Sequence, residues 1–351
     1  MPITVGNITL FMGPHTLGGP DDLEAAIIDF IAGAQDSLRI SVQELDHRPI
    51  GEAIIAAKRR GVSVHMIMEQ DYLKEKREPK AGKAGALDEN RALLMEILRV
   101  GIDAKADYNP KIFHQKFIVR DGVSVLTGST NFTTTGVTKN LNHVTIIHDV
   151  KVAKEYKKEF AQLRKGIFGA HSLAHGRKPL EGHYVSHTRV KPLFAPDHIP
   201  ELEFLKQMNK AKSRIDFAIF TFAQSSGIDD GLANAKRLGL GVKGLLDRKA
   251  ANQKWAAKST LKDAGVTLFT NKTGTGVGKV HHKLMTIDDQ LTIIGSFNYT
   301  GAANLTNDEN IVVLGDLDET DPAKRDAQAR LADYARAEID RIIRDLAEPL
   351  V

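Results

Sequence analysis

Residues 114–121 read HQKFIVRD and residues 281–288 read HHKLMTID, so both stretches match the pattern H-x-K-x4-D. After six further residues each stretch continues as G-S-x-N, at residues 128–131 and 295–298. One short match arises easily by chance, whereas two matches with the same continuation at the same spacing do not. The chain is therefore interpreted as an internal duplication, in which each half supplies one histidine and one lysine.

A strand, a turn and a second strand are predicted around each motif. In the first copy, residues 114–119 form the strand, Asp121-Gly122 the turn, and residues 123–126 the returning strand. Because side chains alternate along a strand, His114 and Lys116 face one side and Gln115 faces the other. By the same rule His282 faces away from His281, and we expect it to have a packing or supporting role. Asp121 lies at the turn, where a structural role is expected.

The duplication extends beyond the motifs. Helical stretches at 22–34 and 201–211 each precede an apolar, strand-like run, and Gly61 and Gly239 each follow a helix end as predicted caps. Because strands alternate with helices, we expect an α/β fold of two similar lobes, each a mixed β-sheet flanked by helices. The predicted domains are an N-terminal lobe (1–170), a linker (171–192) and a C-terminal lobe (193–351). An extra charged stretch at 72–90 is either a solvated surface loop or a lip over a cleft.

Composition limits the possible classes of function. The 351 residues are 42% hydrophobic, which suits packed cores, and the net charge of +4 allows a polyanionic substrate without requiring one. The chain has no cysteine, which excludes disulfides, thiolate chemistry and Cys-based zinc sites. There is no apolar run of about 18 residues and no signal-peptide pattern, so we predict a soluble, cytoplasmic or unassigned protein without a membrane anchor.

The paired motifs resemble those of the phospholipase D superfamily, and the resemblance covers nearly the whole chain. It implies that the two lobes are related by a pseudo-two-fold axis and share one active site at their junction. It also implies a covalent phosphohistidine intermediate that water or an alcohol then attacks. Finally, it implies that the acidic residue following one motif orients the histidine of the other.

Cleavage of a phosphodiester requires a nucleophile, an acid for the leaving oxygen, and positive charge near the non-bridging oxygens. Two histidines, two lysines and two asparagines meet these needs without a metal or another cofactor. The candidate catalytic residues are His114, Lys116, His281, Lys283, Asn131, Asn298, Glu309, Asp121 and Asp288. The candidate substrate-binding residues are Ser129, Ser296, Asn142 and Lys279. A metal site built from His281, His282 and Asp288 is disfavoured, because adjacent residues on a strand point in opposite directions.

One departure from the family pattern distinguishes the two histidines. The second motif is followed by Asn307-x-Glu309, whereas the first is followed by Asn140-x-Asn142, where the family usually has an acid. If the pairing crosses between lobes, Glu309 contacts His114 and Asn142 contacts His281. A carboxylate stabilises a positively charged imidazole, so His114 is the predicted nucleophile and His281 the general acid. Pairing within a lobe would exchange these roles.

Three substrate hypotheses remain. We favour a nuclease acting on DNA or RNA, because residues 295–300 resemble the corresponding tail of the family's small bacterial endonucleases and the chain is little longer than two lobes. The low aromatic content, 6%, gives no evident base-stacking platform. The alternative is a phospholipase D or phosphatidyl transferase acting on phospholipid head groups. A non-enzymatic binding module is disfavoured by the intact motifs. We expect a monomer with pseudo-dimeric lobes.

Overall fold

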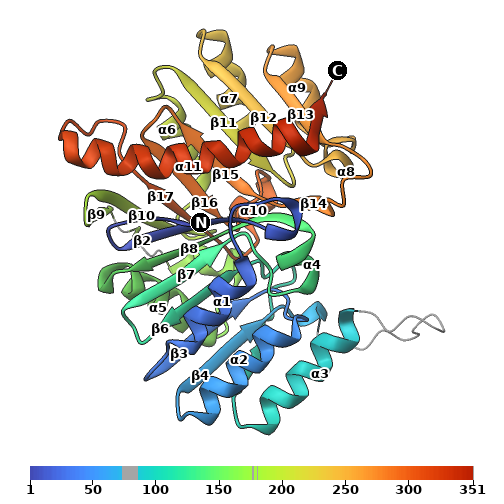
Figure 1. Cartoon of the computed structure of the whole chain (residues 1–351), viewed down its shortest axis with the longest axis vertical. Helices are drawn as coiled ribbons and strands as arrows, with labels where there is room; N and C mark the ends of the chain where they lie inside the picture. The colour runs from blue at the N-terminus through green and yellow to red at the C-terminus, as the bar shows by residue number, and fades with distance from the viewer. Residues whose placement is uncertain (73–85, 176–177, 180, 351) are drawn as a thin grey trace.

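The structure, a computed structural model, describes residues 1–72, 86–175, 178–179 and 181–350. Within this part of the chain, the strands form two nine-stranded mixed sheets flanked by helices, one sheet in each lobe (Figure 1). This confirms the predicted α/β fold of two similar lobes.

The first sheet consists of a path of eight strands and one short strand added from the second half of the chain. In spatial order the path is β1 (Ile3–Val5), β2 (Ile8–Gly13), β8 (Asn140–His148), β7 (Ser124–Gly128), β6 (Lys116–Arg120), β3 (Ser37–Val42), β4 (Ser63–Met68) and β5 (Asp103–Ala106). Strands β3, β4 and β5 run parallel, and β6 pairs with β3 in antiparallel fashion, with Lys116 opposite Val42. The ninth strand, β14 (Lys279–Val280), pairs with β8.

The second sheet repeats this order. Taken in the same direction, it runs β9 (His183–Val185), β10 (Thr188–Ala195), β17 (Glu309–Leu314), β16 (Leu291–Gly295), β15 (Lys283–Ile287), β11 (Arg214–Ile219), β12 (Gly241–Leu246) and β13 (Thr267–Asn271). A ninth strand, β18 (Ala347–Pro349), pairs with β13 at the edge. The motif strand β15 pairs with β11 as β6 pairs with β3, with Lys283 opposite Ile219. The two H-x-K motifs therefore occupy equivalent places in the two sheets.

Helices cover both faces of each sheet. The outer helices are α1 (Leu23–Ala32), α2 (Arg48–Arg59) and α3 (Ala86–Arg99) in the first lobe, and α6 (Pro200–Met208), α7 (Ile228–Arg237) and α9 (Lys258–Asp263) in the second. Helices α5 (Val150–Arg164) and α11 (Pro322–Leu346) contribute to a third apolar core that draws residues from both sheets. In Figure 1, α11 crosses the second sheet and the N-terminus lies where the lobes meet. Because one core spans the junction, the lobes are held together by apolar burial.

The motif aspartates stabilise the lobes at a distance from the histidines. Asp121 and Asp288 both have positive φ, +54° and +49°, in the turns that end β6 and β15. The Asp121 carboxylate accepts hydrogen bonds from the amides of residues 35–37, and the Asp288 carboxylate accepts them from the amides of residues 212–214. These bonds lower the pKa of both carboxyl groups. The aspartates lie at the opposite ends of these strands from the histidines, so we propose a structural role for both.

The segment between the halves is more ordered than a simple linker. Residues 183–192 of the predicted linker contribute β9 and most of β10 to the second sheet. The scattered His and Gly residues concealed this short hairpin in the sequence, and the predicted domain boundaries remain a proposal. Most of the predicted lip at 72–90 lies outside the described residues. Of the helices that the structure describes, none has both the length and the apolar character needed to cross a membrane.

The remaining helices are short. Helices α4 (Thr134–Thr138) and α10 (Gly301–Leu305) follow the two G-S-x-N segments, and α8 (Arg248–Ala251) follows β12. Within the described residues, 3-10 helices occupy His15–Leu17, Gln70–Tyr72 and Gly169–His175. Gly61 and Gly239 have φ of +98° and +91° directly after α2 and α7, as expected for the predicted caps.

Candidate active site

His114 is held by the second lobe. Its backbone amide donates to the carbonyl of Asp308, and its Nδ1 lies 2.7 Å from Oε2 of Glu309, the first residue of β17. Glu309 is fully buried and His114 is 7% exposed. The structure therefore contains the cross-lobe contact predicted for this histidine.

His281 is held in the corresponding way by the first lobe. Its amide donates to the carbonyl of Leu141, and its Nδ1 lies 2.8 Å from Oδ1 of Asn142 on β8. Each histidine therefore has its Nδ1 engaged by a partner from the opposite lobe, and its Nε2 is left for chemistry. The partners differ in one respect, because His114 faces a carboxyl group and His281 faces a neutral amide.

The two lysines are buried beside the histidines that they follow. The Lys116 Nζ donates to the carbonyl of His114 at 2.8 Å and to Oε1 of Gln43 at 3.1 Å. The Lys283 Nζ donates to the carbonyl of His281 at 2.7 Å and lies 5.4 Å from the centre of the Phe220 ring. The H-x-K spacing thus lets each lysine bind the backbone of its own histidine while its charge stays in the site.

The histidines and lysines share one electrostatic environment. Burial, followed by the charges of Lys116 and Lys283, lowers the pKa of both histidines well below the usual range. Burial likewise lowers the pKa of Lys116 to about 7 and holds the pKa of Lys283 well below its usual range. Buried cations that face one another are unfavourable, and a bound phosphate would offset this repulsion. The arrangement is therefore suited to an anionic ligand.

Burial also shifts the pKa of Glu309, raising it to about 8, although Lys116 and the Ser296 hydroxyl act in the opposite direction. A positive charge that develops on the His114 imidazole would favour the Glu309 carboxylate, and the carboxylate would in turn favour that charge. The Glu309–His114 pair therefore stabilises a cationic imidazole more strongly than the neutral ring of the empty site. An interaction that is stronger with the charged transition state than with the neutral ground state accelerates a reaction.

The Gly-Ser pair of each G-S-x-N segment packs against the strand of its own lobe that carries Asn142 or Glu309, the partner of the other lobe's histidine. Gly128 and Gly295 have φ of +151° and +146°, and a Cβ at either position would lie 2.3 or 2.2 Å from a backbone carbonyl of the neighbouring strand. The Ser129 hydroxyl donates to Asn142 Oδ1, and the Ser296 hydroxyl donates to Glu309 Oε2. Both serines are fully buried, so these contacts indicate positioning of the partners, and direct binding of substrate stays a prediction.

The two motif asparagines differ in their surroundings. Asn298 Oδ1 accepts a hydrogen bond from the amide of Thr221 at 3.3 Å. The buried Oδ1 of Asn131 has no hydrogen-bond partner among the described residues. A buried amide oxygen without a partner is costly, which marks Asn131 as a group able to gain from a bound ligand.

Sequence reasoning missed a polar layer that joins the lobes behind the histidines. On one side of the junction, Asn310 Nδ2 donates to Oε1 of Gln115 at 2.7 Å. On the other side, the His143 and His282 rings are parallel, with their Nδ1 atoms 3.2 Å apart. His282 therefore faces away from the site, as predicted, and supports Asn142 through its neighbour His143. The alternation of side chains along β8 and β17 was the available signal for this layer.

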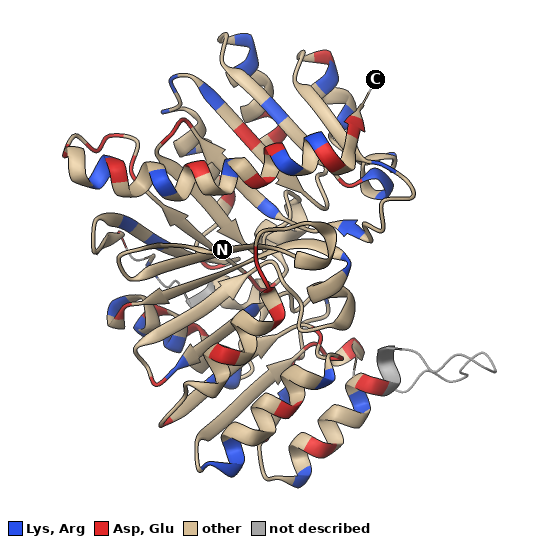
Figure 2. Ribbon diagram, viewed as in Figure 1, with Lys and Arg blue, Asp and Glu red and all other residues tan. Residues whose placement is uncertain are grey.

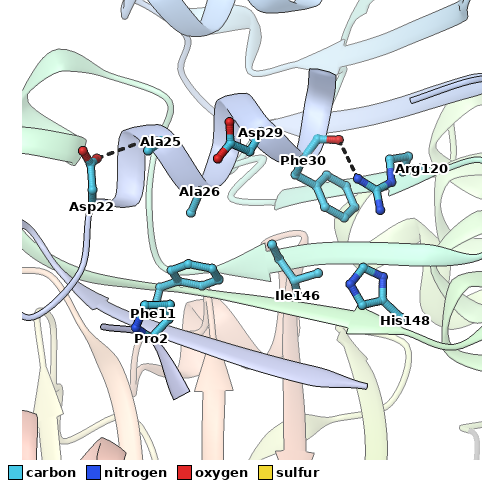
Figure 3. A pocket seen from close by; sticks show the side chains of 10 residues that line it. All are labelled: Pro2, Phe11, Asp22, Ala25, Ala26, Asp29, Phe30, Arg120, Ile146 and His148. Atoms are coloured by element: carbon cyan, nitrogen blue, oxygen red, sulfur yellow. Dashed lines mark hydrogen bonds between the residues drawn. The ribbon is translucent and has the colours of Figure 1, made fainter. Parts of the chain in front are cut away.

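The mouth of the site is asymmetric. Lys279 on β14 is exposed, and its Nζ lies 5.0 Å from the centre of the Phe220 ring. A cavity of about 310 Å³ opens there, lined by Phe220, Trp255 and basic residues of α8 and β14, two elements that carry blue segments in Figure 2. A separate cavity of about 380 Å³ lies between α1 and the far ends of β6 and β8, where Arg120 donates to the carbonyl of Phe30 (Figure 3). The second cavity contains none of the candidate site residues.

The alternative metal site does not assemble. His281 and His282 point in opposite directions, and Asp288 lies at the far end of β15. Throughout the part of the chain that the structure describes, no group of three or more His, Asp or Glu side chains could hold a metal ion.

Comparisons with known proteins address the family and the fold of the chain. The family model described as "Cardiolipin synthase, PLD-like domain" matches residues 27–164 and 204–330. A mitochondrial cardiolipin hydrolase from Xenopus laevis is 29% identical over 150 residues, which are 43% of this chain and 63% of that protein. A phospholipase D from Rickettsia bellii is 30% identical over 153 residues, which are 42% of this chain and 74% of that protein. The structure of a phosphatidylserine synthase from Haemophilus influenzae has the same fold, with a TM-score of 0.68 and 13% identity, over 100% of this chain and 89% of that one.

Proposed function

The chain belongs to the phospholipase D-like family, and from this premise we propose that it is a phosphodiesterase that cleaves nucleic acid through a phosphohistidine intermediate. The observation that carries the proposal is the crosswise pairing of His114 with Glu309 and of His281 with Asn142. This pairing gives two otherwise equivalent histidines different partners, and hence different chemical roles.

In the first step, Nε2 of neutral His114 attacks phosphorus and the bond from phosphorus to the leaving oxygen breaks. Nε2–H of protonated His281 donates its proton to that oxygen. Lys116 and Lys283 hold the non-bridging oxygens, and the Glu309 carboxylate stabilises the positive charge on the His114 ring. The negative charge of the substrate raises the pKa of His281 and so helps to keep this acid protonated.

In the second step, water attacks phosphorus and the bond from phosphorus to Nε2 of His114 breaks. His281, now neutral, accepts the proton from the water, and both histidines return to their starting states. The enzyme needs no metal ion in this scheme, because the lysines supply the positive charge.

The substrate class is supported by the mouth of the site. Lys279 places an exposed positive charge at the junction, where a chain of phosphates can continue beyond the scissile one. Aromatic rings beside this charge suit bases. Cleavage of a phospholipid is the second candidate, because the curated relatives include proteins named phospholipase D and cardiolipin hydrolase. The exposed Tyr108 and Ile112, close to His114 in sequence, also suit an apolar surface.

One assay separates the two candidates. The protein is incubated in EDTA with labelled single-stranded DNA, duplex DNA, RNA and phospholipid vesicles. His114→Ala serves as the inactive variant, and His187→Ala, in the exposed turn between β9 and β10, serves as the matched control. We expect nucleic acid products with the wild type and His187→Ala only, at rates that fall steeply with salt because bound counterions are released. Products from vesicles alone would replace the nuclease proposal with the lipid one.

A further inference from the structure

The cavity of about 310 Å³ beside His281 is a candidate binding site in its own right, and we call it the aromatic subsite. Its walls include the rings of Phe220 and Trp255, the polar side chains of Thr221 and Gln253, and the lysines 249 and 279. The lining also includes Asp247, whose buried carboxylate accepts hydrogen bonds from the amides of Lys249, Ala250 and Val280. The volume of the subsite falls at the lower end of the roughly 300–1,000 Å³ range typical of small-ligand sites. Apolar rings with a few polar and basic groups suit a flat, polar, anionic ligand.

Phe220 connects the subsite to the reacting groups. Its ring centre lies 5.3 Å from the ring centre of His281 and 5.4 Å from the Nζ of Lys283. The subsite therefore adjoins the histidine that protonates the leaving oxygen. A substituent attached to that oxygen would leave the reaction centre in the direction of Phe220.

Trp255 forms an aromatic wall that is fixed by its backbone while its side chain remains accessible. Its carbonyl accepts a hydrogen bond from the Gln224 amide at 3.0 Å, and the neighbouring Ala256 pairs with Ala223 in an isolated bridge. The residue is nevertheless 45% exposed. Because the backbone that carries it is held in place, the accessible ring can stack on a ligand with less loss of conformational entropy than a ring on an unpaired loop.

In the described part of the first lobe, the residue that corresponds to Phe220 is not aromatic. The amide of Phe220 donates to the carbonyl of His282, as the amide of Gln43 donates to the carbonyl of Gln115, so Gln43 is the equivalent residue. Gln43 binds Lys116 with its amide oxygen, and the acidic Glu44 follows it where Thr221 follows Phe220. The exposed Lys249 and Lys279 lie on the side of Phe220, so a nucleic acid strand is favoured there.

We propose that the aromatic subsite binds the nucleoside on the leaving-group side of the scissile phosphate, with its base stacked on Trp255 or Phe220. Lys249 and Lys279 bind the phosphate that follows this nucleoside. The inference rests on the proposed nuclease function. It adds a direction in which the strand lies across the site, because stacking holds only the segment attached to the leaving oxygen.

Trp255 is the only tryptophan in the chain, so its fluorescence reports directly on the subsite. His114→Ala protein, which does not turn over, is titrated with an octathymidylate, with an abasic oligonucleotide of the same length, and with phosphatidylglycerol vesicles. We expect quenching by the octathymidylate and little change with the abasic strand. A blue shift with vesicles and no quenching by the octathymidylate would overturn the inference.

Substitution of Trp255 tests the energetic contribution of stacking. In the His114→Ala background, Trp255→Ala is expected to weaken octathymidylate binding about 5- to 150-fold, which corresponds to losing about 1–3 kcal/mol of stacking. Trp255→Phe should restore most of the affinity, and binding of the abasic strand should be unchanged. An equal loss for both strands would assign Trp255 a purely structural role.

The direction of strand binding is tested with enzyme that retains His114. Its substrates are dinucleotides that lack the base on one side or the other of their single phosphate. Trp255→Ala should lower kcat/KM only for dinucleotides that retain the base on the leaving side. Efficient cleavage of nucleic acid with no effect of Trp255→Ala would refute the subsite and leave the nuclease proposal standing. Absence of any cleavage of nucleic acid by the wild type would instead refute the proposed function.

Discussion

Replacing Glu309 with Gln preserves the shape of the side chain and removes the negative charge that Glu309 can carry when the His114 ring becomes cationic. The Gln side chain can still accept hydrogen bonds from the Ser296 hydroxyl and from Nδ1–H of His114, which now lie 2.6 and 2.7 Å from Glu309 Oε2. The variant should therefore fold and bind substrate normally. It should be impaired where the imidazole gains positive charge, during formation of the phosphohistidine.

The expected loss can be bounded from the geometry. A hydrogen bond to a charged group contributes about 1.5–3 kcal/mol, and two unit charges about 4 Å apart at an effective dielectric constant of about 20 interact by about 4 kcal/mol. A loss of about 1.5–4 kcal/mol slows a step roughly 10- to 1,000-fold. We expect kcat of Glu309→Gln to fall by this factor with little change in KM.

The assay is a rapid-mixing measurement with a p-nitrophenyl phosphodiester, whose leaving group needs little protonation. The first-step rate is read from the burst of p-nitrophenolate, and Asn142→Asp serves as the isosteric counterpart on His281. That variant should leave the burst rate within about twofold for this activated substrate, because the acid is then dispensable. A Glu309→Gln burst as fast as that of the wild type, or a greater loss in Asn142→Asp, would refute the assignment of roles.

Because burial lowers the pKa of Lys116 to about 7, the empty site loses a phosphate-binding charge as pH rises through that value. We therefore expect kcat/KM to decline above about pH 7, and a profile that rises there would contradict this assignment. Asp121→Asn should lower the free energy of unfolding by about 1–3 kcal/mol, measured by urea denaturation, without changing kcat of the folded enzyme. Gly128→Ala should lower the free energy of unfolding by more than the roughly 1–3 kcal/mol of a strained backbone alone, because its Cβ would overlap the His143 carbonyl. Gly61→Ala, with no neighbour within 4 Å, should show only the backbone contribution. Equal losses in the two variants would argue against the overlap.

Much of the catalytic arrangement could be predicted from the sequence because its spacing follows strand geometry. A period of two places His114 and Lys116 together, and the change from Glu309 to Asn142 at corresponding positions predicts unequal partners for the histidines. The crosswise direction of the pairing was carried by the family resemblance alone. The structure then supplied both contacts.

The aromatic subsite could not be predicted for a physical reason. Its lining residues come from segments around 220, 250 and 279, which only the folded second lobe brings together. The low aromatic content gave no evident base-stacking platform, and the sequence does not show that Phe220 and Trp255 line one cavity. The β9–β10 hairpin was missed because its strands are short and lie among His, Gly and charged residues.

The serine hydroxyls illustrate a different limit. In the sequence, Ser129 and Ser296 lie next to the motif asparagines and could as well face a phosphate as a protein group. The positive φ of the preceding glycines turns both serines towards the neighbouring strand, where Asn142 and Glu309 accept their hydrogen bonds. Such a turn depends on the backbone conformation of the folded sheet, which residue spacing does not encode.

The most direct test of the account is to identify the residue that becomes phosphorylated. His281→Ala is mixed with a p-nitrophenyl phosphodiester, quenched at alkaline pH, where phosphohistidine survives, and digested for mass spectrometry. Because the activated leaving group needs no acid while the second step lacks its base, the intermediate should accumulate. The account predicts one adduct per molecule, on His114. An adduct on another residue, or release of p-nitrophenolate by His281→Ala without any covalent adduct, would contradict it.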